Sequence, residues 1–219
     1  LGENTAATGT NGVISGDIFR IRMSVNVDAI ESAHEFKLQY KVGATCSGAG
    51  TWVDVGGLGS GEVWRGYDNS TPTDGSTITS ALLAVSDRLE SYEEANNSAM
   101  MPNALLNTED GEWDWVIQNN AAPEGNFVCF RMVKSDGTVL GSYNDFPQVE
   151  TKQFVPKSKN WRWYDDETSE TPSTALEAEN TQPFGQPIED PIKLRVSLDE
   201  TGGLASTDQK FRLQFSTQS

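Results

Sequence analysis

Residues 18–27, with the sequence IFRIRMSVNV, decide the fold class of this chain. From Phe19 onward every second side chain is apolar, and arginine, serine or asparagine stands between. This period of two is typical of a β-strand with one buried face and one solvated face. Residues 35–42, with the sequence EFKLQYKV, show the same alternation after a short polar connection. The chain is therefore expected to begin with two amphipathic strands.

Four more segments are predicted to be strands, namely residues 51–55, 111–117, 126–133 and 139–146. The sequence Ser-Asp-Gly-Thr at 135–138 predicts a hairpin turn between the last two. Residues 78–97 suit either a short helix or a strand, and we favour a strand, at a sheet edge around residues 90–94. Short strands separated by Gly, Asn, Asp and Pro predict an all-β fold, an antiparallel sandwich.

The composition changes after Pro147, and two domains are expected: a β-sandwich module over residues 1–155 and an extension over residues 156–219. The extension opens with a strand candidate, Trp161-Arg162-Trp163-Tyr164. Residues 165–191 are acidic and contain four prolines, which is typical of an extended linker. Two alternating segments, residues 192–198 and 210–215, are predicted to be the last strands.

The extension repeats the start of the chain. DIFRIRMSV at residues 17–25 aligns with DPIKLRVSL at residues 190–198, and EFKLQYKV at 35–42 aligns with KFRLQFST at 210–217. A Glu-Asn-Thr sequence also precedes the first of these segments in both copies. The three matches keep the same order, about 175 residues apart, which indicates the beginning of a second copy of the module.

Each copy lacks a part that the other has. The strand at residues 161–164 precedes the second copy and has no counterpart ahead of the first, whereas nothing in the second copy corresponds to residues 46–146. Two or three strands alone expose an apolar face and unpaired edges, and are marginally stable. The extension is therefore expected to dock on a neighbouring module or on another copy of the chain. Head-to-tail docking of added strands builds an open filament.

With the strands in this order, residues 15–150 resemble the fibronectin type III and immunoglobulin-like β-sandwich repeat modules of large secreted microbial surface proteins. The resembling segments are FKLQY at 36–40, WVDV at 52–55 and FVCFRMV at 127–133. In that family the corresponding strands form the centre of the larger sheet. The resemblance carries no catalytic motif, and it implies a spacer, an adhesin or a carbohydrate binder.

The acidic balance argues against several partners. The chain has 32 Asp and Glu against 16 Lys and Arg, a formal net charge of −16. An anionic surface repels phosphates, so neither nucleic acid nor an anionic membrane surface is an expected partner. No apolar run approaches the roughly 18 residues of a spanning helix, and no membrane insertion is expected. No signal peptide is recognised, and because Leu1 is not an initiator methionine, a processed or excised product is expected.

Cys46 and Cys129 are the only cysteines. The even count, in an acidic chain rich in Gly, Thr, Ser and Asn, favours a disulfide between them and an oxidising, extracellular or cell-surface location. The alternative is a pair of buried free thiols in a cytosolic protein. The single histidine, His34, argues against multi-histidine metal sites and limits Ser-His-Asp or Cys-His machinery to that one residue.

Asn69-Ser70-Thr71 and Asn96-Asn97-Ser98 match the acceptor pattern for N-glycosylation, which makes Asn69 and Asn96 candidate sites in predicted loops. The acidic clusters at 165–167 and 177–189 offer oxygen ligands for calcium, but their spacing matches no calcium loop, and charge runs are more often simply solvated. We therefore expect no cofactor and keep calcium as the alternative.

The tryptophans divide into two groups. Trp113 and Trp115 share a strand face and are expected in the core, whereas Trp161 and Trp163 have no local core to enter and are expected at an interface between subunits. That predicted interface comprises Trp161, Trp163, Ile192, Leu194, Val196, Phe211, Leu213 and Phe215. An alternative for exposed aromatic residues such as Trp64, Tyr67 and Trp163 is the stacking of sugars.

Three functions are compatible with these patterns. The first is a non-enzymatic structural protein, a subunit of an extracellular filament or surface array assembled head-to-tail by β-strand exchange between copies of this chain. The second is a carbohydrate-binding adhesin module of a tandem-repeat surface protein. The third is a glycoside hydrolase using a carboxylate pair such as Glu112 and Asp114. Nothing in the sequence marks either carboxyl group as having a raised pKa, so no enzymatic activity is expected.

Overall fold

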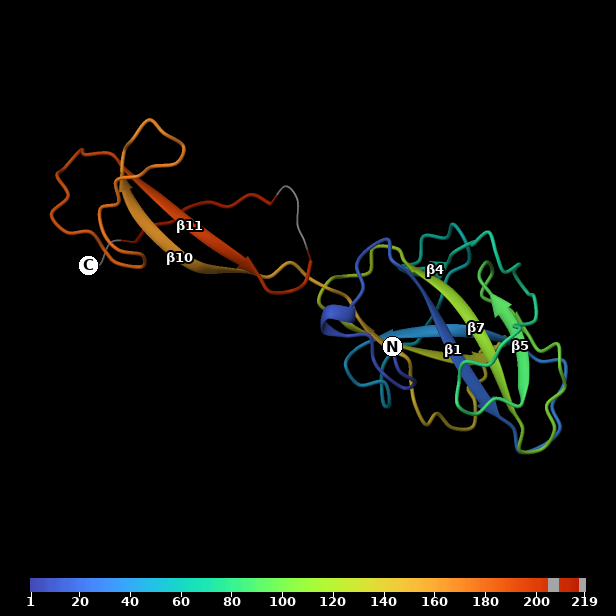
Figure 1. Cartoon of the computed structure of the whole chain (residues 1–219). Coiled ribbons are helices and arrows are strands. Elements are labelled where there is room, and N and C mark those ends of the chain that lie inside the picture. Colours follow the sequence, from blue (N-terminus) through green and yellow to red (C-terminus); the bar gives the residue numbers. More distant parts are fainter. Residues whose placement is uncertain (205–208, 217–219) are drawn as a thin grey trace. The chain divides into compact units, whose positions relative to one another are not determined.

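The computed structural model describes residues 1–204 and 209–216 (Figure 1). Apart from one turn of 3-10 helix, η1 (Gly9–Asn11), every regular element in these residues is a β-strand. The chain divides into two compact units, unit 1 (Leu1–Lys152) and unit 2 (Gln153–Ser219). The sequence placed this boundary three residues later, between residues 155 and 156.

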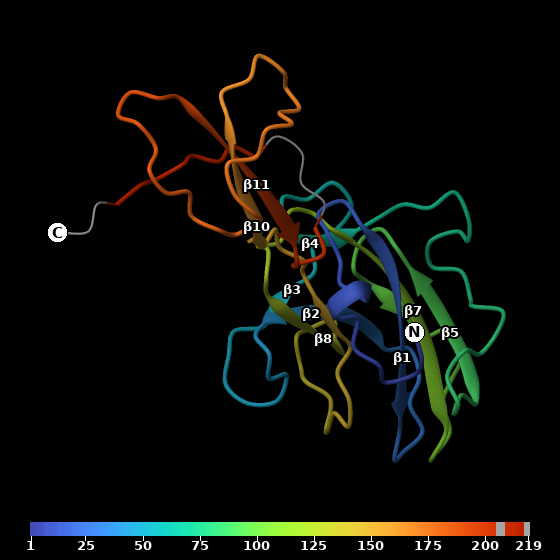
Figure 2. The same ribbon diagram turned by 60° about the vertical axis from the view of Figure 1, so that its left-hand side comes forward.

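Unit 1 is a sandwich of two sheets, and its first sheet is built around β7 (Asp110–Asn119). β1 (Ile18–Asn26) pairs along one edge of β7, and β4 (Trp64–Gly66) and β5 (Arg88–Glu93) pair with β7 as well (Figure 2). β1 and β4 run antiparallel to β7, whereas β5 runs parallel to it. The alternation of residues 18–26 gives β1 one apolar face, and that face is turned toward the second sheet.

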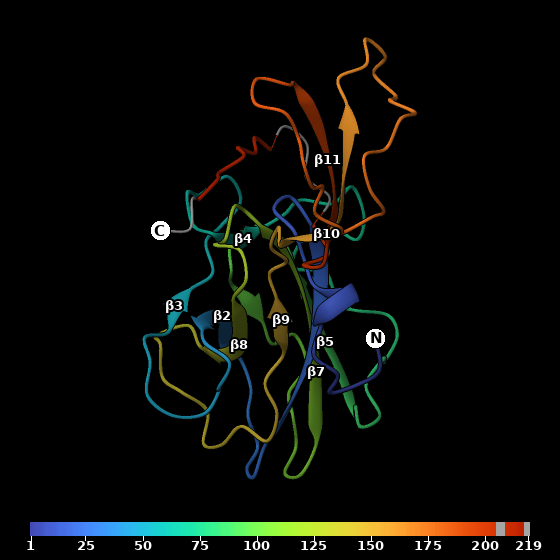
Figure 3. The same cartoon turned by 90° about the vertical axis from the view of Figure 1, so that its left-hand side faces the viewer.

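The second sheet contains the other predicted strand of the chain start, β2 (Glu35–Val42). Its strand order is β3 (Val53–Asp54), β2, β8 (Phe127–Lys134) and β9 (Gln148–Glu150), and the short β6 (Ala99–Met100) also pairs with β2. All pairings in this sheet are antiparallel. Figures 2 and 3 show the two sheets as separate layers.

The core of unit 1 lies between the inner faces of these sheets. It is unusually aromatic: the Phe36 and Trp113 rings meet edge to face at 5.0 Å between centroids, and those of Trp64 and Phe130 at 5.3 Å. Aromatic side chains bury a large apolar area each, and edge-to-face contacts add to that stabilisation. Trp115 is also buried, so the prediction that Trp113 and Trp115 belong to the core is confirmed.

The predicted all-β antiparallel sandwich is confirmed, but a predicted strand at residues 139–146 is wrong. The hairpin turn forms, since the Lys134 amide donates to the Thr138 carbonyl at 2.9 Å. The following residues then fold over the sheet instead of pairing with it. The Tyr143 hydroxyl donates to the Met132 carbonyl at 2.7 Å, and the Phe146 ring stacks on Trp52. These side-chain contacts replace the ladder that the alternation predicted.

The ambiguous stretch 78–97 contains a strand, β5, as favoured. This strand is mostly buried. β5 pairs in parallel with β7, an exception to the antiparallel pattern, and four of its six residues are buried. The predicted strand at 51–55 is reduced to the two residues of β3.

Unit 2 contains one antiparallel ladder in its described part, between β10 (Pro156–Asp165) and β11 (Ile192–Glu200). The register shifts by one residue between Ser158 and Asn160, so Lys159 is the extra residue of a β-bulge. Residues 166–191 form no regular element, yet they are not a free linker. The Leu176 and Asn180 amides donate to the carbonyls of β10, at 3.1 and 2.8 Å.

The predicted strand at residues 210–215 is wrong, since the structure gives these residues no ladder partner. A strand persists only where a neighbour satisfies its backbone groups, and the described residues of unit 2 provide none for this segment. Moreover, no described residue from 153 onward is buried. Unit 2 thus has a ladder but no core of its own in its described part.

Candidate functional site

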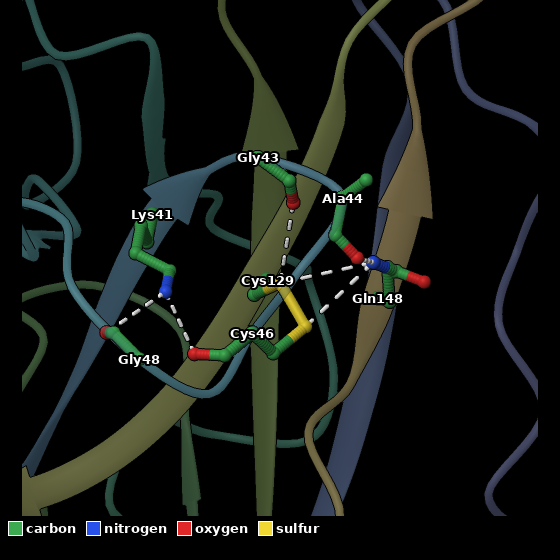
Figure 4. The surroundings of a disulfide bond; sticks show 7 residues. All are labelled: Lys41, Gly43, Ala44, Cys46, Gly48, Cys129 and Gln148. Carbon is green, nitrogen blue, oxygen red and sulfur yellow. Dashed lines mark hydrogen bonds between the residues drawn. A yellow bond between two sulfur atoms is a disulfide. The ribbon is translucent and has the colours of Figure 1, made fainter.

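The predicted disulfide is present. Cys46, in the loop after β2, is bonded to Cys129 in β8, with the two Cα atoms 5.5 Å apart (Figure 4). A cross-link that closes a loop of this length removes much of the conformational freedom of the unfolded chain. The cysteines are therefore a structural pair of unit 1.

Two side chains hold the loop that carries Cys46. The Lys41 ammonium is buried and donates to the Cys46 carbonyl at 2.8 Å, and Gln148 donates to the Ala44 carbonyl at 3.1 Å (Figure 4). The same Gln148 amide lies 3.6 and 3.8 Å from the two sulfur atoms. The disulfide is thus fixed from both sides by neighbours on β2 and β9.

Five of the eight predicted interface residues, namely Trp161, Trp163, Ile192, Leu194 and Val196, lie together on the ladder. Trp161 is paired with Val196 and Trp163 with Leu194, and directly paired residues of an antiparallel ladder share one face. Ile192 and Leu198 fall on the same face by alternation. The apolar face, as we call this set, comprises Trp161, Trp163, Ile192, Leu194, Val196 and Leu198.

A shallow concavity of about 230 Å³ lies on the apolar face, lined by Ser158, Trp161, Trp163, Leu194 and Val196. Val196 and Leu198 are exposed and both tryptophans are only half-buried. Soluble proteins rarely leave a contiguous patch of this kind uncovered, and such patches mark interaction sites. The opposite face carries polar and charged side chains, among them Arg162, Lys193 and Arg195.

The aligned segments of the two units have opposite burial. Phe36, Leu38 and Tyr40 of β2 are 4%, 0% and 7% exposed. Their counterparts Phe211, Leu213 and Phe215 are 60%, 76% and 92% exposed. The three C-terminal residues of the predicted interface are thus solvated, and the structure does not bring Leu213 or Phe215 onto the apolar face. Within the described residues, Phe211 meets the ring of Phe154, at 6.4 Å between centroids.

The two glycosylation candidates differ in access. Asn69 is half-buried, and its side-chain amide donates to the Tyr92 hydroxyl at 2.9 Å. Asn96 is exposed, on a turn whose backbone amides bind Glu93. A glycan is therefore sterically compatible with Asn96, whereas at Asn69 it would compete with the contact to Tyr92.

The sugar-stacking candidates are mostly covered. Trp64 is fully buried in the core, so the expectation that its ring is available to a sugar is wrong, and Tyr67 packs on the cluster of Ile78, Tyr92 and Val116. The sequence reasoning missed Trp52, a half-buried ring with the Arg131 guanidinium 4.3 Å from its centroid. Trp163 is half-buried and lines the concavity on the apolar face.

Glu112 and Asp114, the carboxylate pair considered for hydrolysis, are fully buried on the outer face of β7. Arg22 forms ion pairs with both, and Arg20 pairs with Asp114. Residues 67–87 cover this face: the Leu82 amide donates to Glu112 at 3.0 Å, and Arg22 donates to the Ser80 carbonyl at 3.0 Å. The pair therefore anchors a covering loop, and both carboxylates are inaccessible to solvent.

The acidic end of β5 is a second buried polar cluster, on the strand that the sequence predicted at a sheet edge. Glu93 accepts hydrogen bonds from the amides of Ala95, Asn96 and Asn97 at 2.8–3.0 Å. Burial nevertheless raises the pKa of Glu93 to about 7. Burial also raises the pKa of Glu90, and that of Tyr92 to about 12, where the hydrogen bond to Glu94 adds to the effect.

The acidic clusters considered for calcium do not converge. Within residues 1–204 and 209–216, no three Asp, Glu, His or Cys side chains come together to hold a metal ion. Glu167 instead accepts the amides of Ser173 and Thr174, and these hydrogen bonds lower its pKa to about 2. In the same part of the chain, no helix is long and apolar enough to cross a membrane.

Comparisons of the chain with protein-family models, with curated proteins and with solved structures found no match. The apolar face of unit 2 and the sandwich of unit 1 therefore carry the functional argument by themselves.

Proposed function

We propose that this chain is a non-enzymatic structural subunit of an extracellular filament or surface array, in which unit 2 of one copy docks on a neighbouring copy by β-strand exchange. One observation carries the proposal: the segments that form the core of unit 1 have aligned counterparts in unit 2 that stay uncovered. Burial of apolar side chains is the main favourable term in association. A second copy of the chain is a partner of the right chemistry, because it contains the complete sandwich.

Other features support an extracellular location and a non-enzymatic role. The Cys46–Cys129 disulfide fits an oxidising compartment. Arginines and a covering loop seal the candidate carboxylates Glu112 and Asp114, so a substrate would have no access to this pair. The net charge of −16 fits neither nucleic acid nor an anionic membrane as a partner.

The size distribution of the purified full-length chain tests the proposal. We expect polymers by gel filtration with light scattering, and filaments on negative-stain grids. The chain with Trp161→Ser and Trp163→Ser should lose them, because the apolar face loses both rings. The matched control is Arg162→Ser with Tyr164→Ser, on the same strand but on the opposite face, which should assemble normally. A monodisperse monomer of the unsubstituted chain at all concentrations would end the proposal.

A second candidate function is carbohydrate binding by the apolar face, in an adhesin module. It is favoured by the half-exposed Trp161 and Trp163, which line the same shallow concavity. Tryptophan fluorescence titrated with common polysaccharides tests this alternative. A flat response over the whole panel would eliminate it.

A further inference from the structure

β1 and β11 are aligned strands, and each is paired with a strand that carries a Trp-x-Trp sequence. In unit 1, Met23 lies opposite Trp113 and Ile21 opposite Trp115. The counterparts of Met23 and Ile21 in unit 2 are Val196 and Leu194. These lie opposite Trp161 and Trp163 in the same antiparallel register. A Trp-x-Trp strand is thus a regular partner of this strand type.

The two ladders nevertheless use different edges. In unit 1, the Val27 amide donates to the Glu109 carbonyl at 3.3 Å, and its carbonyl accepts from Thr108 at 2.8 Å. Backbone groups point to opposite edges at successive residues of a strand. The apolar residues of β1 from Phe19 onward are odd-numbered, as Val27 is. They therefore direct their backbone groups toward β7.

In unit 2 the aligned apolar residues do the reverse. The Thr201 amide donates to the Val155 carbonyl at 3.0 Å. The odd-numbered residues of β11 therefore direct their backbone groups toward β10. Leu194 and Val196 are even-numbered, so they direct their backbone groups away from β10. Consistently, the Trp161 and Trp163 carbonyls are bonded on the far side of β10, to Asn180 and Leu176.

The edge of β1 that faces away from β7 is therefore unpaired. The corresponding edge of β11 is paired with β10. In the described residues β1 forms a ladder only with β7, which leaves the backbone groups of Arg20, Arg22 and Ser24 without a strand partner. Next to this edge, Phe19 and Met23 of the inner face are only partly buried. The edge thus offers both a hydrogen-bonding rim and incompletely covered apolar surface.

We propose that the edge of β1 turned away from β7 is the docking site for the β10 segment of a second copy of this chain. The segment lies antiparallel to β1 in the register that it has on β11. Because Ser197 is paired with Asn160 and aligns with Ser24, the proposal places Ser24 opposite Asn160 of the second copy. It also places both tryptophans on the inner, apolar face of β1.

The same segment gains more from β1 than from β11. On β11 its tryptophans stay half-buried, because unit 2 has no buried residue in its described part. On β1 they would lie beside the edge of a complete aromatic core. Strand addition to a free edge is an established mode of recognition, in which the backbone supplies hydrogen bonds and alternate side chains supply specificity. This inference deepens the strand exchange of the proposed function and rests on it.

Amide hydrogen exchange, measured by NMR, tests the site with a synthetic peptide of residues 156–165. The acceptor is the full-length chain with Trp161→Ala and Trp163→Ala, so that its own segment does not compete. At saturation we expect exchange to slow at least tenfold at the amides of Arg20, Arg22 and Ser24. The control peptide has Trp161 exchanged with Arg162 and Trp163 with Tyr164. This shift by one residue moves both rings to the other face and should give no protection.

A cross-link between two copies is the second test, and it does not depend on the tryptophan variant. Full-length chains with Ser24→Cys and with Asn160→Cys are mixed and treated with a short thiol-reactive linker, and a covalent dimer is expected. Asp165→Cys is the matched control. In the proposed register this position lies five residues further along the strand, about 16 Å from Ser24.

The outcomes separate this inference from the proposed function. If the chain polymerises but neither the protection nor the cross-link appears, the β1 edge is not the acceptor and the inference is overturned, while filament formation stands. Equal protection by both peptides also overturns it. If the protection and the cross-link appear while the chain stays below filament size, the docking site stands and the filament does not.

Discussion

β2 of unit 1 and residues 210–216 of unit 2 share the order aromatic, basic, leucine, glutamine, aromatic, and they differ in what surrounds them. β2 lies between β3 and β8 and faces a second sheet, whereas the described residues around 210–216 include no pairing strand. Leu38 is accordingly inaccessible and Leu213 is 76% exposed. Alternation determines which face of a strand is apolar, but a second layer is needed before that face becomes a core. The difference between the units is therefore one of missing neighbours.

Removal of the disulfide should have the largest effect, and it should be confined to unit 1. With Cys46→Ser and Cys129→Ser, the free energy of unfolding is expected to fall by about 4 kcal/mol, since the loop closed by the bond spans 83 residues. Urea denaturation followed by tryptophan fluorescence measures this. Assembly through unit 2 should persist below the new unfolding midpoint. An unchanged midpoint would mean that the bond does not form in solution.

The aligned leucines give the most direct comparison of the units. Leu38→Ala should destabilise the chain by about 3.5 kcal/mol, because it opens a cavity in a closed core. Leu213→Ala removes the same atoms from an exposed side chain and should change stability by less than about 0.5 kcal/mol. The same denaturation experiment measures both. Equal losses would show that unit 2 buries Leu213 in solution and would remove the contrast between the units.

Glu93 makes the stability of unit 1 depend on pH. Its pKa is about 7 in the folded chain against an ordinary value of 4.5, so the folded state binds the proton more tightly than the unfolded state. The stabilisation is complete below pH 4.5 and is lost as the pH rises through 7, by about 3 kcal/mol. Glu93→Gln keeps the acceptor for the turn amides and removes the charge. The variant should therefore lack this decline between pH 4.5 and 7.

Denaturation curves of the native chain and of Glu93→Gln, compared at several pH values, isolate this group from the other carboxyl groups. A difference between the two proteins that does not change with pH would contradict the assignment. Unit 2 provides the contrasting case: Glu167 is half-buried, and hydrogen bonds from the Ser173 and Thr174 amides lower its pKa. The contribution of Glu167 to the stability of the folded chain is present above pH 4.5 and is lost as the pH falls through about 2.

Local alternation was sufficient to predict most of unit 1, since β2 coincides with the predicted segment 35–42 and β1 differs from its own by one residue. It could not reveal that the outer face of β7 is covered. Arg20, Arg22 and Glu112 are residue types that normally face water, and only their mutual ion pairs allow residues 67–87 to lie over them. Charge pairing between strands some 90 residues apart leaves no local pattern in the sequence.

The candidate site was predictable in part for the same reason. Trp161 and Trp163 were found because one strand carries both on the same face, and the structure pairs them with Val196 and Leu194. The C-terminal segment was predicted as a strand, but alternation implies a strand only where a partner is at hand. Residues 139–146 failed similarly, because Tyr143 and Phe146 lie across the sheet.

The pairing of β1 with β7 also sets the order in which unit 1 can fold. Ile18 pairs with Gln118, so the first strand of the chain has no ladder partner until the residues of β7 have been synthesised. Contacts so distant in sequence slow folding, because a long loop must close before any burial compensates for it. β1 therefore has no ladder partner until most of unit 1 has been synthesised. The Cys46–Cys129 disulfide has the same requirement, because it cannot form until Cys129, 83 residues further along the chain, has been synthesised.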